Sequence, residues 1–174
     1  MSEAAKYSVV DSLRDGRRIE IRALRPEDRD ELLAAVGRAS AQTIYRRFFG
    51  PHRREFTEQE IAFFLNVDFV NHVALAAVVE EGGRPTIVGG ARYVMVEPKK
   101  AEVAFAVVDA YQGQGIGATL MRHLAAIARE AGLTELIAEV LPENIPMLKV
   151  FEKSGLRPDT KRERGVVHVT LHLA

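Results

Sequence analysis

The decisive stretch of the sequence is Ala101-Glu-Val-Ala-Phe-Ala-Val-Val-Asp-Ala-Tyr-Gln-Gly-Gln-Gly-Ile-Gly-Ala-Thr-Leu120. It begins as an apolar strand pattern and passes through a glycine-rich turn into the start of an amphipathic helix. Such a turn directs several backbone N–H groups, together with the positive end of the helix dipole, toward one point. The stretch therefore predicts a strand–turn–helix unit that binds a phosphate or pyrophosphate group.

Hydrophobic periodicity on both sides of this stretch predicts a single α/β domain. Short turn-like segments at 81–85 and 97–100 imply an antiparallel meander, and a strand after the helix implies a parallel crossover. The expected strands cover residues 18–24, 72–79, 86–96, 101–109, 135–141 and 164–173. One expected helix begins at Pro26. Further expected helices include residues 44–48, 61–65, 116–131 and 144–154. We therefore expect a mixed, mostly antiparallel central sheet flanked by helices in residues 18–174, after an N-terminal extension at residues 1–17.

Composition narrows the class of protein. The 24 Lys and Arg side chains balance 24 Asp and Glu side chains, and the sequence contains no basic block that would favour a nucleic acid or a membrane surface. The absence of cysteine excludes disulfides and thiolate metal sites. The first residues lack the apolar core of a signal peptide, and no apolar run reaches the roughly 18 residues of a membrane span. We therefore expect a cytoplasmic protein without a nucleic-acid or membrane partner.

The glycine turn has three other interpretations. Residues 113–118 formally match the dinucleotide-binding pattern G-x-G-x-x-A, with Glu135 and Glu139 about 20 residues later. That pattern normally opens the first strand of a sheet of repeated β-α-β units, whereas here an antiparallel meander precedes it. A P-loop requires Gly-Lys-Ser/Thr, which is absent. A purely structural turn remains possible, but it does not account for three glycines within five residues at a helix start.

Two motifs resemble those of the GCN5-related N-acetyltransferase (GNAT) superfamily. Gln112-Gly-Gln-Gly-Ile-Gly117 resembles the signature Gln/Arg-x-x-Gly-x-Gly/Ala, which binds the pyrophosphate of acetyl-CoA in that superfamily. Glu143-Asn-Ile-Pro-Met-Leu-Lys-Val-Phe-Glu-Lys-Ser-Gly-Leu156 resembles its second motif. The element order is also similar over residues 18–173. The resemblance implies the GNAT fold and acetyl-CoA as co-substrate.

A narrower similarity is to the acetyltransferase domain of bacterial Pat-type protein lysine acetyltransferases. The similar segments are Asp15-Gly-Arg-Arg-Ile-Glu-Ile-Arg22, Ser40-Ala-Gln-Thr-Ile-Tyr-Arg-Arg-Phe-Phe49, Ile87-Val-Gly-Gly-Ala-Arg-Tyr93 and Ala101-Glu-Val-Ala-Phe105. This resemblance implies a protein lysine as amine acceptor, for example a lysine of an acyl-CoA synthetase. Within the second of these four segments, Tyr45-Arg-Arg-Phe-Phe49 either lines the acceptor site or forms a helix with an apolar face and two solvated arginines.

Glu102 is the candidate general base. On a strand, its face would also carry Ala104 and Ala106, and these small side chains leave room for a substrate. Partial burial would raise the pKa of the carboxyl toward the range useful for proton transfer. The alternative is a solvated carboxylate at a strand start. The Pat-type enzymes place a catalytic Glu at the matching position, so the resemblance favours the catalytic role.

The resemblance also implies the residues that hold acetyl-CoA. Backbone groups of Phe105, Ala106 and Val107 would hold the pantetheine arm and polarise the thioester carbonyl. The pyrophosphate would be bound by the turn residues Gly113, Gln114, Gly115, Ile116, Gly117 and Ala118, where a Cβ on the glycines would obstruct the phosphates. Asn144 would hydrogen-bond the cofactor or cap its own helix.

One position departs from the superfamily pattern. Phe151 stands where many members have a Tyr general acid. Pat-type enzymes also tend to lack this Tyr, so the departure agrees with the resemblance to them. It would pack on the cofactor or serve as a plain core aromatic. Three functional hypotheses follow: transfer to a protein lysine, transfer to a small amine, and a non-catalytic acyl-CoA sensor. His168 and His172 share a strand face without a third ligand, so no metal site is expected.

Overall fold

The computed structural model describes residues 6–28, 30–31, 67–111, 113–140, 142, 145–154 and 156–173. The helical segments expected at 44–48 and 61–65, and with them the Tyr45–Phe49 segment, lie outside these ranges. So do Gln112 and Asn144.

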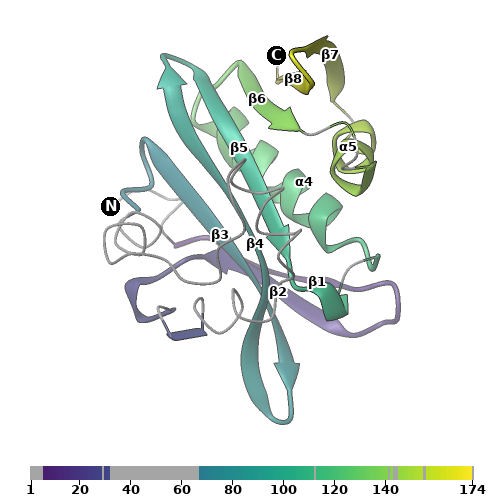
Figure 1. The fold of residues 1–174 in the computed structure, drawn as a ribbon. Coiled ribbons are helices and arrows are strands. Elements are labelled where there is room, and N and C mark those ends of the chain that lie inside the picture. The colour runs from purple at the N-terminus through teal and green to yellow at the C-terminus, as the bar shows by residue number, and fades with distance from the viewer. Residues whose placement is uncertain are drawn as a thin grey trace.

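A single sheet dominates the described part of the chain (Figure 1). It contains eight strands in the order β1-β2-β3-β4-β5-β6-β8-β7. The strands are β1 (Ser8–Ser12), β2 (Arg18–Ala23), β3 (His72–Glu81), β4 (Arg84–Glu97), β5 (Lys100–Val107), β6 (Glu135–Val140), β7 (Arg157–Glu163) and β8 (Val166–His172). Two α-helices, α4 (Ile116–Glu130) and α5 (Ile145–Glu152), and two short 3-10 turns, η2 (Pro26–Asp28) and η3 (Asp109–Tyr111), complete the described elements. The predicted mixed, mostly antiparallel α/β domain is confirmed.

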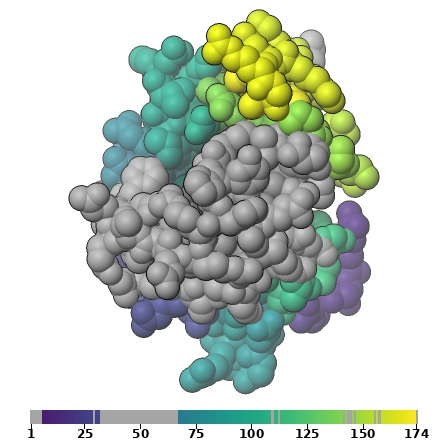
Figure 2. All heavy atoms as spheres, in the orientation of Figure 1, coloured from purple at the N-terminus to yellow at the C-terminus, as the bar shows by residue number. Residues whose placement is uncertain are grey.

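The connections agree with the expected ones. β3, β4 and β5 form an antiparallel meander, and β5, α4 and β6 form a parallel crossover. Two-residue turns at 82–83 and 98–99 can join only antiparallel neighbours, whereas the parallel pair needs the intervening helix. Viewed as spheres in the same orientation, the β7–β8 hairpin and the tip of the β3–β4 hairpin lie at opposite ends of the molecule (Figure 2).

Two edge strands are not predicted by the sequence patterns. β1 lies inside the predicted extension at residues 1–17 and pairs with β2. The expected last strand at 164–173 is in fact the second half of a hairpin, because Arg164 and Gly165 form its turn and β7 precedes it. Edge strands bury few side chains, so their apolar alternation is weak. Pro158 in β7 further masks that strand, although proline is tolerated at an edge.

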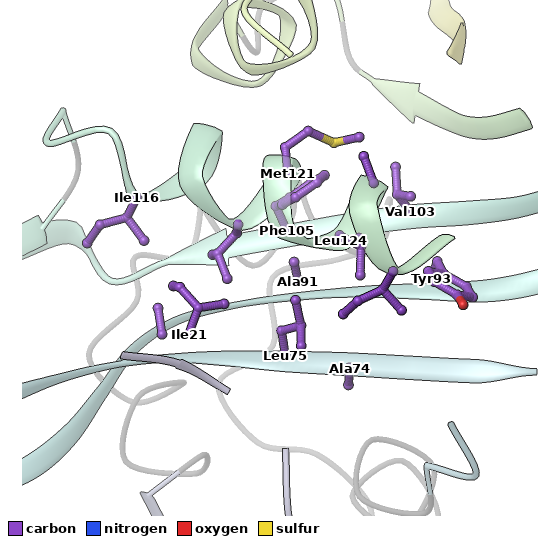
Figure 3. Packing of buried hydrophobic residues seen from close by; sticks show 14 of the residues in the cluster. Ile21, Ala74, Leu75, Ala91, Tyr93, Val103, Phe105, Ile116, Met121 and Leu124 are labelled. Carbon is purple, nitrogen blue, oxygen red and sulfur yellow. The ribbon is translucent and has the colours of Figure 1, made fainter. Parts of the chain in front are cut away.

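The hydrophobic core lies between α4 and one face of the sheet (Figure 3). Leu120 and Leu124 of α4 are fully buried, and this helix packs over β3, β4 and β5. The sheet face beneath them presents Leu75, Ala91, Tyr93, Val103 and Phe105. Burial of one such leucine side chain contributes about 1.5–3 kcal/mol. This packing fixes the N-terminal end of α4 relative to β5.

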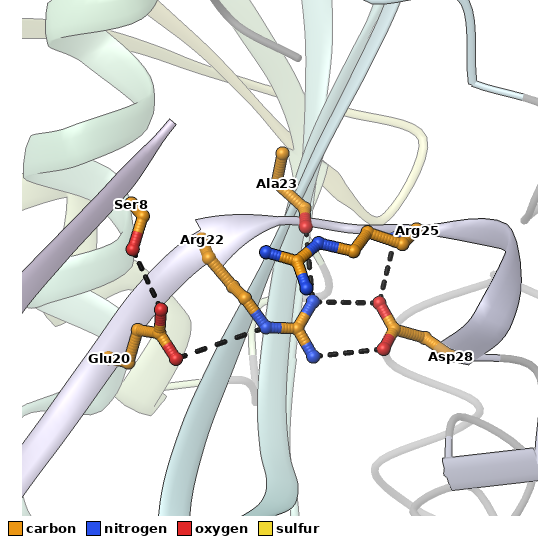
Figure 4. A network of polar contacts seen from close by, with 6 residues as sticks. All are labelled: Ser8, Glu20, Arg22, Ala23, Arg25 and Asp28. Carbon is orange, nitrogen blue, oxygen red and sulfur yellow. Dashed lines mark hydrogen bonds and ion pairs between the residues drawn. The ribbon is translucent and has the colours of Figure 1, made fainter. Parts of the chain in front are cut away.

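A polar cluster fixes the chain where it leaves β2 (Figure 4). Arg22 donates two hydrogen bonds to the carboxylate of Asp28, at 2.8 and 2.9 Å. The backbone N–H of Arg25 donates a third at 2.7 Å. Only 7% of Asp28 is exposed. Burial by itself raises the pKa of this carboxyl, but the hydrogen bonds and positive charges of Arg22 and Arg25 outweigh it and lower the pKa.

We expect Asp28→Asn to destabilise the protein by about 2 kcal/mol at neutral pH, since it removes the nearer of the two carboxylates that pair with the largely buried Arg22 guanidinium and leaves only Glu20, at 4.0 Å. A carboxyl with a lowered pKa in the folded state stabilises the fold above its ordinary value of about 3.9, and this contribution is lost as the pH falls through the lower folded value. The difference between wild type and Asp28→Asn in urea unfolding should therefore shrink below about pH 4. Asp15→Asn, at the exposed Arg17–Asp15 pair, is the control and should unfold like the wild type. A difference that stays constant with pH would contradict the assignment.

Candidate active site

The N-terminus of α4 presents unsatisfied backbone donors. The helix begins after Gly115, which adopts the left-handed conformation with φ +86° and has no side-chain cap hydrogen bond. No acidic side chain lies in the first turn. The first N–H groups of a helix have no partner within the helix, and the dipole adds positive potential there. The turn is therefore an anion site in both geometry and charge.

Gly113 and Gly115 owe their identity to backbone conformation, since both have positive φ, +82° and +86°. Gly117 has a different reason. A Cβ at Gly117 would lie 3.0 Å from Cγ2 of Val150, so this glycine allows α4 and α5 to approach each other. At Gly117 the structure thus adds a packing reason, and the expectation that a Cβ at all three glycines would obstruct the phosphates stays a prediction.

The β1–β2 hairpin supports the glycine turn from outside the helix. Arg14 Nη1 donates to the carbonyl of Gly113 at 3.3 Å. Arg17 lies over the ring of Tyr111, with its Cζ 5.1 Å from the ring centroid, and its Nη1 is 3.5 Å from the phenol oxygen. The Tyr111 hydroxyl in turn donates to Glu81. Segments about 100 residues apart in the sequence therefore hold the turn in place.

Within the turn, the side-chain oxygen of Gln114 is buried and has no hydrogen-bond partner among the residues that the structure describes. A buried polar atom without a partner is costly and marks a place where a ligand or water is expected. It lies between the two glycines with positive φ.

The strand that leads to the turn diverges from its parallel neighbour (Figure 1). β6 pairs with β5 only at Lys100, Ala101 and Glu102, although β6 itself continues to Val140 and stays paired with β8. Beyond Glu102, β5 has strand pairing on its β4 side alone in the described part of the chain. The opening between β5 and β6 therefore exposes a strand edge, and an extended molecule can add to such an edge.

Glu102 lies at the point where the two strands separate. Its cross-strand neighbours are Val94 and Ile137, which share its face of the sheet. The side chain is exposed, so the partial burial expected from the sequence is not found. Ala104 and Ala106, next along the same face, are only partly buried. The small side chains expected beside the carboxylate are thus in place.

Arg92 is a charged neighbour that the sequence analysis did not single out as a site residue. Its partner in β5 is Ala104, so it lies on the same face as Glu102 and diagonally from it. Its Nη1 is 2.8 Å from Nε2 of His72. Burial lowers the pKa of the Arg92 guanidinium to about 10, which still leaves it charged at neutral pH. The sequence did offer a signal for Arg92, because it is the one charged residue within the apolar strand pattern of residues 86–96.

Phe151 is part of the core. Its side chain is 2% exposed and packs edge to face against Phe105, with ring centroids 5.9 Å apart. So little free surface remains that the core alternative is favoured over packing on the cofactor. Since Asn144 lies outside the described residues, its two alternatives stay open.

The two histidines of β8, His168 and His172, lie close to carboxylates. His172 Nε2 is 2.7 Å from Asp159, and His168 Nδ1 is 3.7 Å from Glu139. Among the described residues, no three His, Cys, Asp or Glu side chains are grouped so that they could hold a metal ion. No described helix combines the length and the apolar character needed to cross a membrane.

Comparison with known proteins finds acetyltransferases. A model of the "Acetyltransferase (GNAT) family" matches residues 38–156. Acetyltransferase PA5475 of Pseudomonas aeruginosa is 37% identical over 128 residues, which are 73% of this chain and 68% of that protein. Acetyltransferase Pat of Mycolicibacterium smegmatis is 33% identical over 145 residues, 82% of this chain but 42% of that protein. The chain therefore spans less than half the length of this second relative.

A solved structure extends the similarity to three dimensions. The GNAT domain of S. lividans PAT is 34% identical and superposes with a TM-score of 0.85. The match covers 95% of this chain and 96% of that domain.

Proposed function

Because the chain belongs to the acetyltransferase (GNAT) family and is related to Pat acetyltransferases, we propose that it transfers the acetyl group of acetyl-CoA to a protein lysine. One observation carries the proposal: the uncapped start of α4 follows directly on a strand whose edge is open and whose first residues include Glu102. A site for a phosphate, an edge for an extended arm and a carboxylate thus belong to one strand–turn–helix unit.

The residues present fit acetyl-CoA. The backbone N–H groups at residues 113–118 would hold its pyrophosphate, as the geometry at Gly115 favours an anion there. Along residues 105–107, where β5 does not pair with β6, the strand would align the pantetheine arm, and a backbone N–H there would polarise the thioester carbonyl. The thioester supplies the activated acetyl group.

Glu102 would prepare the acceptor. A lysine ammonium has an ordinary pKa of about 10.4, so at neutral pH it must lose a proton before its nitrogen can attack. The Glu102 carboxylate would accept that proton directly or through one water. Its exposure leaves it accessible to an incoming side chain, and Ala104 and Ala106 leave space beside it.

Departure of the thiolate needs no Tyr at position 151. Phe151 carries no acidic proton and is buried against Phe105. A thiol has a pKa near 8.5, so the thiolate can leave without full protonation. This departure from the superfamily pattern is also what keeps the non-catalytic sensor as the second candidate function.

An acceptor panel tests the proposal. The protein is incubated with acetyl-CoA and one acceptor at a time. The acceptors are a purified acyl-CoA synthetase, a lysine peptide and small amines. Released thiol and the mass of each acceptor are then measured. We expect thiol release together with acetylation of a lysine in the synthetase. Turnover of small amines alone would overturn the protein-lysine assignment, and tight acetyl-CoA binding without transfer to any acceptor would support the sensor.

A further inference from the structure

The guanidinium of Arg14 lies against the glycine turn although it comes from the tip of the distant β1–β2 hairpin. We propose that Arg14 forms an ion pair with a phosphate group of the coenzyme A moiety bound at this turn. This inference rests on the proposed function, because it takes acetyl-CoA as the ligand. It adds a side-chain contact from the N-terminal hairpin to a site otherwise built from backbone groups.

The position of Arg14 is given by two contacts. Its Nη1 donates to the carbonyl of Gly113 at 3.3 Å. Its Nε lies 3.5 Å and its Nη2 3.9 Å from the position that a Cβ on Gly115 would take. The guanidinium therefore lies along both glycines of positive φ, next to the uncapped N–H groups at the start of α4.

The charge of Arg14 is not neutralised within the described part of the chain. No carboxylate there lies within ion-pair distance of its guanidinium, since Asp15 pairs with Arg17 and Asp11 pairs with Arg122. A guanidinium has five N–H donors, and one of them is in use among the residues that the structure describes. An exposed guanidinium with spare donors beside an anion site is suited to phosphate.

The hairpin also holds Arg14 in place before any ligand binds. The tip is closed by hydrogen bonds from the Leu13 N–H to the Arg17 carbonyl and from the Gly16 N–H to the Leu13 carbonyl, at 2.8 and 3.0 Å. Leu13 is 6% exposed, and Arg17 lies over Tyr111. Because the backbone around Arg14 is already ordered, only its side chain loses conformational entropy when it meets the phosphate.

The alternative to an ion pair is a structural role for Arg14, and the two roles predict different effects of salt. If the residue only supports the turn through the Gly113 carbonyl, its loss would weaken ligand binding by a factor that salt does not change. An ion pair with phosphate is screened by salt. The salt dependence of the dissociation constant therefore separates the two roles.

The experiment is calorimetry of acetyl-CoA binding to wild type, Arg14→Ala, Arg14→Lys and Arg84→Ala. Arg84 is a matched control, because it is an exposed arginine in the β3–β4 hairpin. At low salt we expect Arg14→Ala to raise Kd about 5- to 20-fold, Arg14→Lys to recover part of the loss, and Arg84→Ala to match wild type. The difference between Arg14→Ala and wild type should shrink steadily as salt approaches about 0.5 M.

The outcomes are distinct. A Kd for Arg14→Ala equal to that of wild type, or a ratio that does not change with salt, would overturn the proposal for Arg14. If wild type itself does not bind acetyl-CoA, the proposed function fails instead. Repeating the titrations with 3′-dephospho-CoA identifies the phosphate: the effect of Arg14→Ala persists if the contact is to the pyrophosphate and disappears if it is to the 3′-phosphate. Circular dichroism and thermal unfolding establish that the variants are folded.

Discussion

Replacing Glu102 with glutamine is expected to lower kcat about 100-fold or more while leaving the Kd for acetyl-CoA within about twofold. Glutamine keeps the size and most of the hydrogen bonding of the side chain but cannot accept the proton of the lysine ammonium. The measurement is steady-state thiol release with a lysine acceptor, together with calorimetry of acetyl-CoA binding. Because Glu102 is exposed, the substitution should not alter stability.

A pH series tests whether Glu102 acts on the protonated form of the acceptor. As the pH rises toward the ordinary lysine pKa of about 10.4, more acceptor is already deprotonated, so the deficit of Glu102→Gln should narrow. Glu139→Gln is the matched control, since Glu139 is an exposed carboxylate two residues after Ile137, the β6 partner of Glu102. Equal thiol release by wild type and Glu102→Gln would remove Glu102 from the mechanism.

Replacing Gly115 with valine is expected to weaken acetyl-CoA binding at least tenfold. A β-branched residue at φ +86° carries about 1–3 kcal/mol of backbone strain, which the turn can relieve only by moving its N–H groups out of alignment. A clash within the protein is not the cause, because the nearest protein atom to a Cβ there, Nε of Arg14, lies at an ordinary 3.5 Å. Calorimetry with acetyl-CoA measures the effect.

Gly165→Val supplies the control for this strain. Gly165 has φ +75° in the β7–β8 turn, and a Cβ there meets nothing within 4 Å. The variant should lose a comparable amount of stability yet bind acetyl-CoA like wild type. If Gly115→Val also binds with wild-type affinity, the turn does not hold the pyrophosphate.

The sequence predicts the elements correctly where the hydrophobic periodicity matches a face that is buried in the structure. The strands at 72–79 and 86–96 and the helix at 116–131 lie within a residue or two of β3, β4 and α4, because each has a strongly buried face. β1 was missed for the opposite reason: Val9 and Val10 on this edge strand are 38% and 52% exposed. An edge strand is held mainly by backbone hydrogen bonds to its neighbour, and these do not require a particular pattern of side chains.

In the candidate site, too, some features can be inferred from the sequence and others depend on tertiary contacts. The glycine turn, its helix and Glu102 could be identified from the sequence because they lie within one short continuous segment whose spacing reflects local backbone geometry. The reason for Gly117 could not be read there, since it depends on Val150 of another helix. Nor could the placement of Arg92 diagonally from Glu102, which follows from the register between β4 and β5.

The sequence by itself determined the local chemistry of this protein: a strand, a turn of glycines with positive φ, and a helix start that together suit a phosphate group. Local backbone preferences act over a few residues, so the sequence carries them directly. Only the tertiary structure decided that β5 and β6 separate after Glu102 and that Arg14 lies against the turn from a hairpin about 100 residues away. Those placements depend on which strands pair and on how α4 packs over the sheet, and such long-range contacts are set by the whole core at once.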